Sequence, residues 1–301
     1  KFKNVEVCIF EYEGSGLGLP VDVLKKEYSD KDINFDEDFI YPGALSEDAL
    51  YKAAGGKGNT NRNIELSQLA HFVKFFKSGK GIGQIQEPAE NCDTILFGHS
   101  LGGQLATEYA FKYVPFVLAS KDKLAKENYY VDSLILCAPL YILSAPTRPP
   151  SPLIYVSKLL SKMIPNVKID AEIAVDEITD HEDMKKFVLN DYPYVNPCIG
   201  TVLMFYEMLS TGENMNNNSF FKKYKKAPEG LLPKNIIWVH GDADGVNDIA
   251  GSKNVAEIVN KTFGTLINGK FESIKNGKHS LFACTDEIYN DFLKYISSWS
   301  F

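Results

Sequence analysis

The chain has few cysteines, and none lies in a pattern that points to a disulfide framework or a metal site. Its five cysteines are an odd number, and no Cys-x-x-Cys spacing occurs among them. Cys8 and Cys137 lie inside apolar runs, as buried thiols commonly do. We therefore expect reduced core thiols in a cytoplasmic protein, with no metal and no other cofactor.

The sequence also lacks a long apolar run, a recognisable signal peptide and an excess of positive charge. The longest uncharged stretch, residues 133–147, contains Pro139 and Pro146 and is shorter than the roughly 20 apolar residues of a spanning helix. The first residues lead directly into an apolar run. The net charge of −7 and the pI of about 5.4 argue against nucleic acid as a partner. A soluble or peripherally bound protein is expected.

What is present is an alternation of short apolar runs and helical patterns, which predicts an α/β fold. The expected strands are residues 5–12, 94–97, 133–138, 235–240 and, as a weaker candidate, 269–274. The expected helices are residues 65–77, 102–117, 250–263 and 285–298. Such alternation is typical of a parallel sheet flanked by helices, where ligands gather at the carboxyl ends of the strands.

Two segments interrupt the alternation. Residues 19–63 are polar, acidic and glycine-rich, which predicts a long surface excursion of unassigned purpose. Residues 139–233 contain two apolar helical patterns, 153–164 and 201–209. These helices either pack only on the main core or form a cap with an apolar inner face. We expect a core made of residues 1–138 and 234–301, and a cap or lid at 139–233.

The first of these two helical patterns is amphipathic. Ser157, Lys158, Ser161 and Lys162 share one face, while apolar residues that include Val156 and Met163 fill much of the rest. The second pattern is apolar nearly all round, which predicts a helix that is buried or faces an apolar ligand.

Gly98-His99-Ser100-Leu101-Gly102 is the most informative motif. It follows an expected strand and precedes an expected helix, which is the setting of a nucleophile elbow. In so tight a turn, Gly98 and Gly102 fit where a Cβ atom would clash. Ser100 is then the candidate nucleophile, with the helix N-terminus beneath the developing negative charge. An ordinary glycine-rich turn is the alternative interpretation.

A serine nucleophile needs a general base and an orienting carboxylate, which follow it in the chain with the acid first. His279 follows the last expected strand and precedes the last expected helix, so it is the candidate base. The other histidines fit less well: His71 lies in a helix, His99 is the variable position of the elbow, His181 falls in a solvated acidic segment, and His240 ends a strand.

Three carboxylates after residues 235–240 compete for the role of the acid. Asp244 is favoured because it lies at the apex of the loop, whereas Asp242 suits a turn and Asp248 suits a helix N-cap. The backbone N–H of Leu101 is the expected first donor of the oxyanion hole. A second donor is not found in the sequence and is expected before residue 1.

With Ser100, Asp244 and His279 in this order, the chain resembles the α/β-hydrolases, and most of all the monoacylglycerol lipase family. Beyond the elbow, the resemblance rests on residues 159–170, 240–248 and 278–282. It implies a mostly parallel sheet flanked by helices, with a helical cap inserted after the third strand of this chain. It also implies the same nucleophile, acid and base.

The chain departs from the family pattern at two places near its start. Where the family has Asp-x-Arg-Gly-x-Gly, residues 11–16 read Glu-Tyr-Glu-Gly-Ser-Gly, with Glu13 in place of arginine. The family also has earlier strands and a His-Gly oxyanion loop before this point. We therefore expect that the sequence begins after them.

The resemblance implies a serine hydrolase that cleaves a monoacylglycerol to glycerol and a free fatty acid through an acyl-enzyme. The acyl chain would lie against apolar cap residues, and the cap could also dock on a lipid droplet or membrane surface. The alternatives are a lysophospholipase or general carboxylesterase and, from another class, a non-catalytic lipid-binding homologue. A nucleotide-binding protein is more distant, because residues 14–18 lack the Gly-x-Gly-x-x-Gly spacing.

Overall fold

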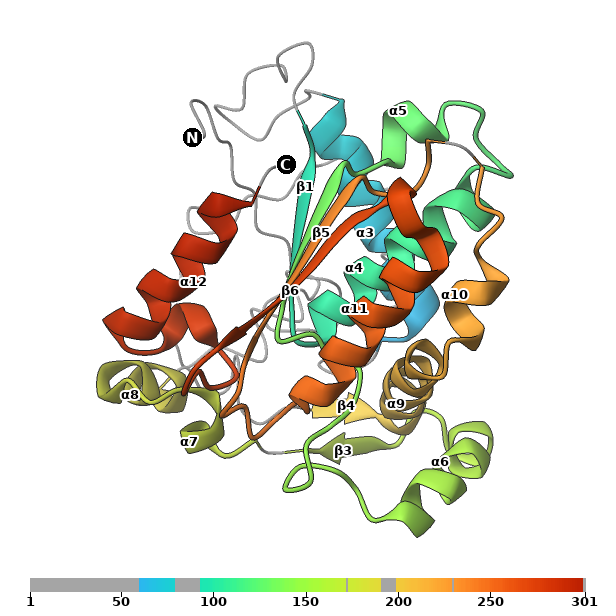
Figure 1. The fold of residues 1–301 in the computed structure, drawn as a ribbon. Coiled ribbons are helices and arrows are strands. Elements are labelled where there is room, and N and C mark those ends of the chain that lie inside the picture. The colour runs from blue at the N-terminus through green and yellow to red at the C-terminus, as the bar shows by residue number, and fades with distance from the viewer. Residues whose placement is uncertain (1–59, 79–92, 172, 191–198, 229, 300–301) are drawn as a thin grey trace, which may run out of the picture.

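In the part of the chain that the structure describes, the fold is built on a parallel four-stranded sheet (Figure 1). A computed structural model describes residues 60–78, 93–171, 173–190, 199–228 and 230–299. Within them, the strands lie in the order β1 (Ile95–His99), β2 (Ser133–Cys137), β5 (Asn235–Gly241) and β6 (Asn268–Ile274). All three neighbouring pairs are parallel. The expected strand 5–12 and most of the excursion 19–63 lie outside the described residues.

The central strands are apolar on both faces, which explains why their sequences read as continuous apolar runs. In β2 and β5, Leu134, Leu136 and Trp238 pack into one core cluster, while Ile135 and Val239 pack into the other. Successive side chains of a strand point to opposite faces, so each run supplies both layers. The sheet is therefore buried between helices rather than exposed on one face.

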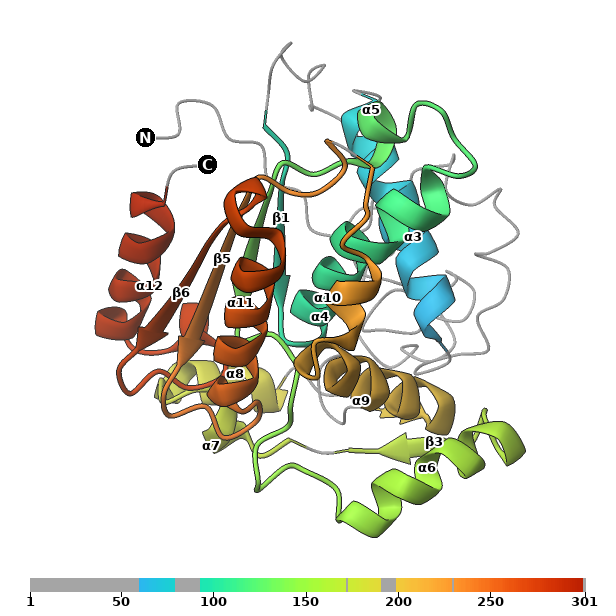
Figure 2. The same cartoon turned by 45° about the vertical axis from the view of Figure 1, so that its right-hand side comes forward.

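Helices cover the two faces unequally (Figures 1 and 2). The first cluster is shared with helices α3 (Arg62–Lys77), α4 (Leu101–Glu108) and α11 (Ile249–Phe263). The second is shared with α12 (Asp286–Ser298). The short helix α5 (Ala125–Tyr129) precedes β2.

The single helix expected at residues 102–117 is divided in the structure. The α-helical part ends at Glu108, and Tyr109–Leu118 continues in wider π-helical turns that contain Pro115. Proline has no backbone N–H, so it cannot maintain the regular α-helical hydrogen-bond pattern.

Much of the segment between β2 and β5 lies at the carboxyl ends of the strands, at the bottom of Figures 1 and 2, whereas α10 (Ser219–Lys223) lies higher, beside α11. Its helices are α6 (Ser151–Met163), α7 (Val175–Ile178), α8 (Glu182–Asn190), α9 (Val202–Asn216) and α10 (Ser219–Lys223). A small antiparallel pair, β3 (Lys168–Asp170) and β4 (Ile199–Thr201), accompanies them. The prediction missed this strand pair and ended the second helix at Leu209. The boundaries of the proposed cap at residues 138 and 234 stay a prediction.

The apolar face of α6 is turned inward only in part, since Ile154 and Leu160 are half-buried. Val156 and Met163 are 44% and 69% exposed, whereas Ser161 of the polar face is buried. Helical periodicity shows that an apolar stripe exists, but not what the stripe faces. Helix α9 behaves as expected, because Val202, Met204 and Met208 are buried.

Within the described ranges, no helix is long and apolar enough to cross a membrane.

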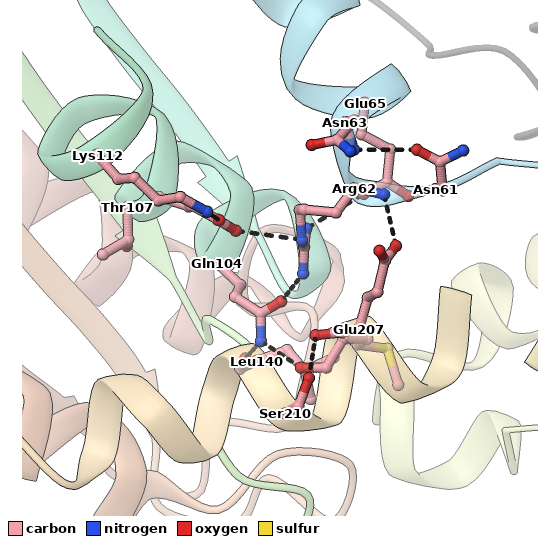
Figure 3. A network of polar contacts seen from close by, with 12 residues as sticks. Asn61, Arg62, Asn63, Glu65, Gln104, Thr107, Lys112, Leu140, Glu207 and Ser210 are labelled. Atoms are coloured by element: carbon pink, nitrogen blue, oxygen red, sulfur yellow. Dashed lines mark hydrogen bonds and ion pairs between the residues drawn. The ribbon is translucent and has the colours of Figure 1, made fainter. Parts of the chain in front are cut away.

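A buried polar network joins α9 to the main core (Figure 3). The Arg62 guanidinium contacts the carboxylates of Glu65 and Glu108, each at 3.2 Å, and the side-chain oxygen of Gln104. The backbone N–H of Arg62 donates to Glu207 of α9 over 2.8 Å. Charged groups with so little exposure need partners of this kind, since an unpaired buried charge is costly.

Glu65 is the member of the network with the most altered acidity. Burial raises its pKa to about 7, although the charge of Arg62 opposes the change, and the nearby carboxylates of Glu207 and Glu108 add to the rise. The folded protein therefore binds more protons at Glu65 than the unfolded chain does between pH 4.5 and about 7. Stability from this group falls as the pH rises through that window.

We expect Glu65→Gln to remove this loss of stability at neutral pH. Between pH 5 and pH 8, the unfolding free energy of the variant should rise relative to the wild type by about 2 kcal/mol. Urea unfolding at a series of pH values measures the difference. The control is Glu257→Gln on the exposed side of α11. A constant difference between Glu65→Gln and wild type across this range would contradict the assignment.

Candidate active site

Ser100 lies in the sharp turn between β1 and α4. Its backbone has φ 52° and ψ −121°, in the positive-φ region that side chains other than glycine rarely adopt. The turn is held because the backbone N–H of Ser100 donates to the Cys137 carbonyl, and its own carbonyl accepts from Leu140. This strained strand–turn–helix arrangement is the geometry of a nucleophile elbow.

The two glycines of the motif do not have equal roles, which corrects the expectation for Gly102. A Cβ atom at Gly98 would lie 2.5 Å from the Gly102 carbonyl oxygen, so only glycine fits there. At Gly102 a Cβ atom would meet nothing within 4 Å among the described residues. The crowded position is instead Gly103, where a Cβ atom would lie 2.6 Å from Pro139 Cβ.

Leu101 is the first residue of α4, directly after Ser100. The first N–H groups of a helix have no partner within the helix. Among the described residues, no backbone acceptor takes the Leu101 N–H. It is thus available for an oxyanion at the helix N-terminus, where the helix dipole also favours negative charge.

His279 and Asp244, which are far apart in the sequence, form a hydrogen-bonded pair. His279 Nδ1 lies 2.9 Å from Asp244 Oδ2, and both side chains are almost fully buried. The backbone N–H of His279 donates to the Glu177 carbonyl of α7, which anchors the histidine loop. Since a carboxylate can only accept, His279 Nδ1 carries a proton, and in the neutral form of the ring the free electron pair is then on Nε2.

The Asp244 carboxylate is surrounded by donors. Its Oδ1 accepts from the backbone N–H groups of Val246 and Asn247, at 2.8 and 2.9 Å. Its Oδ2 lies 3.0 Å from His240 Nε2 in addition to the contact with His279. Burial alone would raise the pKa of Asp244, but the hydrogen bonds from the two histidines hold this pKa far below its usual range. Asp244 is therefore ionised.

The two competing carboxylates have other partners. Asp242 Oδ1 accepts from the backbone N–H of Asn276 over 2.6 Å. Asp248 is the N-cap of α11 and accepts from the Ala250 N–H over 2.9 Å. Of the three candidates for the acid, Asp244 is thus the one that pairs with His279.

His99 and His240 also belong to this site, although the sequence interpretation assigned them no role. The His99 ring packs against the His279 ring with centroids 4.7 Å apart, and its Nε2 lies 3.1 Å from the His279 carbonyl oxygen. Burial, followed by the nearby charge of His279, lowers the pKa of His99 to about 3. His99 is therefore neutral and donates to the backbone that carries the candidate base.

The remaining histidines lie elsewhere. His71 is in α3, as expected, whereas His181 is half-buried rather than solvated.

Ser100 directly follows His99, whose ring contacts the His279 ring. In the described part of the chain, no hydrogen bond joins the Ser100 side chain to His279. Such contacts often tighten only when substrate binds.

Among the described residues, no group of three or more His, Cys, Asp or Glu side chains is arranged to hold a metal ion. The expectation that the protein uses no cofactor stays a prediction. The arrangement can activate a serine hydroxyl: it has a histidine whose Nε2 can accept a proton in the neutral form of the ring, an ionised orienting carboxylate and a helix N-terminus below the nucleophile.

Comparisons with known proteins agree with this chemistry. The family model described as serine aminopeptidase, S33 matches residues 55–285. The monoglyceride lipase of Saccharomyces cerevisiae is 24% identical over 246 residues, which cover 81% of this chain and 69% of that protein. A putative monoglyceride lipase of Schizosaccharomyces pombe is 28% identical over 206 residues, 68% of this chain and 47% of that protein. The chain thus spans about two thirds of the first relative and about half of the second.

Solved structures show the same fold. A soluble variant of the S. cerevisiae monoglyceride lipase in complex with a substrate analog superposes with a TM-score of 0.62, covering 81% of this chain and 71% of that one at 24% identity. The monoacylglycerol lipase of Paleococcus ferrophilus gives a TM-score of 0.56 over 82% of this chain and 77% of that one, at 17% identity. The predicted α/β-hydrolase fold and the resemblance to monoacylglycerol lipases are confirmed.

The unequal surroundings of the two motif glycines can be tested directly. Gly98→Ala should open the turn below Ser100, lower the unfolding free energy by about 1–3 kcal/mol and slow labelling by a fluorophosphonate probe at least roughly tenfold. Gly102→Ala is the matched control and should keep both the melting temperature and the labelling rate. Equal behaviour of the two variants would contradict the geometry of the turn.

Proposed function

Because the chain belongs to the family whose model is described as serine aminopeptidase, S33, we propose that it is a serine hydrolase that cleaves monoacylglycerols to glycerol and free fatty acid. The observation that carries the proposal is the His279–Asp244 pair beside the strained Ser100 turn. The names of the two curated relatives, both monoglyceride lipases, support the choice of substrate.

In the proposed mechanism, the ester carbonyl of the substrate binds next to Ser100. Ser100 Oγ attacks the carbonyl carbon while His279 Nε2 takes the hydroxyl proton, and Asp244 stabilises the resulting imidazolium through Nδ1. The Leu101 N–H stabilises the oxyanion. His279 then returns the proton to the departing glycerol oxygen. Water hydrolyses the acyl-enzyme by the same steps and releases the fatty acid.

A cavity between the loop that follows β2, α6 and α9 supports an acyl substrate. It has a volume of about 300 Å³ and is lined mainly by apolar residues of the β2–α6 loop, α6 and α9, among them Leu140, Ile142, Ile154, Met208 and Leu209. Leu140, one of the lining residues, donates its backbone N–H to the Ser100 carbonyl oxygen, so one wall of the cavity is connected to the nucleophile turn. We assign this cavity to the acyl chain, since apolar walls favour burial of methylene groups.

The central test measures fatty-acid release by the wild type and by Ser100→Ala. The substrates are a long-chain monoacylglycerol, the matching diacylglycerol, a lysophospholipid and a short soluble ester. We expect preference for the monoacylglycerol and a loss of kcat by several orders of magnitude in the variant, because the nucleophile is removed. Preference for the lysophospholipid or the short ester would refute the substrate assignment.

One further variant and a labelling experiment on the wild type complete this test. Asp244→Asn should also reduce kcat strongly, because it disturbs the tautomer and the charge that His279 depends on. A wild-type protein that binds monoacylglycerol but neither turns it over nor reacts with a fluorophosphonate would instead be a lipid-binding homologue.

We also propose that the segment between β2 and β5 contacts a lipid droplet or membrane surface. Large apolar side chains are exposed along it: Val156, Leu159, Met163, Ile164, Val167, Ile169, Phe187 and Leu189. Exposed apolar groups on one segment that adjoins the proposed substrate cavity suit an enzyme that takes its substrate from a lipid phase.

The double variant Leu159→Asp with Met163→Asp tests this surface. It should reduce co-sedimentation with monoacylglycerol-containing vesicles about tenfold or more, while hydrolysis of a short soluble ester continues unchanged. Leu266→Asp is the control, because Leu266 is 70% exposed but precedes β6 at its amino end. Vesicle binding that survives the double variant, or falls equally in the control, would contradict the proposed surface.

A further inference from the structure

His240 is a fully buried histidine that shares the Asp244 carboxylate with His279. It lies near the carboxyl end of β5, four residues before Asp244. Its Nε2 is 3.0 Å from Asp244 Oδ2, the same oxygen that lies 2.9 Å from His279 Nδ1. Two imidazole rings therefore donate to one carboxylate oxygen, one from β5 and one from the loop after β6.

The surroundings of His240 fix its tautomer. Nε2 faces two acceptors, Asp244 Oδ2 at 3.0 Å and the Asn247 carbonyl oxygen at 3.3 Å, so it carries the proton. Nδ1 lies 2.8 Å from the Ser252 hydroxyl of α11, which can donate to it. A neutral His240 thus has all of its hydrogen-bonding groups satisfied and needs no second proton.

We propose that His240 is a positioning residue, which competes with His279 for Asp244 Oδ2 and thereby sets the pH below which the enzyme loses activity. The proposal rests on the proposed serine-hydrolase mechanism. Donation by His240 disperses the negative charge of Asp244, so the carboxylate holds a proton on the His279 ring less strongly. The base then stays neutral, and able to accept the Ser100 proton, to a lower pH.

Other ionisable groups around the pair do not take over this role. His99 of β1 is neutral, because its lowered pKa of about 3 keeps it uncharged. Burial raises the pKa of the Cys137 thiol of β2 well above its usual value, so the thiol stays protonated. Lys278 donates to the Asp176 carbonyl oxygen, while Glu177 of α7 approaches Gly245. Among these described groups, His240 and His279 are the ones that touch the Asp244 carboxylate with their side chains.

A pair of substitutions of similar length separates donation from packing. His240→Gln places an amide N–H where His240 Nε2 lies, whereas His240→Met fills the space without a donor. The readout is the rate of fluorophosphonate labelling of Ser100 against pH, with kcat/KM for a short soluble ester measured in parallel. In His240→Met, the acid-side midpoint should move to higher pH by about half a unit to one unit. In His240→Gln it should stay near the wild-type midpoint.

Ser252→Ala is the second test: it removes the hydroxyl that donates to His240 Nδ1, which strengthens His240 Nε2 as a donor, and leaves the acceptors of Nε2 in place. It should move the midpoint in the same direction as His240→Met, but by less. Equal midpoints in wild type, His240→Met and Ser252→Ala would overturn the proposal, as would equal shifts in the Gln and Met variants. If His240→Met fails to fold, Ser252→Ala decides: a midpoint identical to the wild type overturns the proposal.

The pH dependence of labelling tests the role of His240 separately from the identity of the substrate. The labelling rate depends on the activated serine and not on the natural substrate, so the comparison holds for any ester preference. A wild-type protein that does not label at Ser100 would refute the catalytic mechanism itself, and with it the role of His240.

Discussion

The ionised carboxylate of Asp244 is the group around which the site is built. It is buried, no lysine or arginine of the described ranges pairs with it, and two backbone N–H groups and two imidazole rings share its charge. Charge-assisted hydrogen bonds of this kind are stronger than neutral ones, which allows a carboxylate to stay ionised away from water. Because the donors come from the loop after β5, from β5 itself and from the His279 loop, satisfying this one charge holds three pieces of chain together.

The parallel sheet makes that meeting possible. His99 of β1 is in register with Cys137 of β2, and Cys137 is in register with Val239 of β5. The residues that follow these strands therefore emerge at the same edge of the sheet, where they lie close together. Burial of both faces of the central strands fixes this register, since a slip would move every side chain to the other face. The core thus determines where the chemistry can occur.

Local patterns in the sequence predicted the parts of the site but not their mutual orientation. The strand, turn and helix around Ser100 follow from apolar runs and glycines. The choice of Asp244 over Asp242 as the partner of His279 followed from the place of Asp244 at the apex of its loop. The contact of His99 with His279 depends on ring orientation between two strands, which no local pattern contains. Likewise, periodicity marked the apolar stripe on α6, yet only the packed structure places Met163 outside and Ser161 inside.

The buried network at Arg62 shows how the proposed cap is connected to the nucleophile. Gln104, one turn beyond Ser100 in α4, donates to the carbonyl oxygens of Leu140 and of Met208 in α9. The N–H of Leu140 in turn donates to the Ser100 carbonyl. Gln104 also accepts from Arg62, so the network reaches the nucleophile turn and the cavity wall through a single side chain. Because all of these donors and acceptors are buried, α9 cannot move away from α4 without leaving several of them unpaired. Helix α9 is therefore the fixed wall of the cavity, whereas α6 carries apolar side chains that remain exposed.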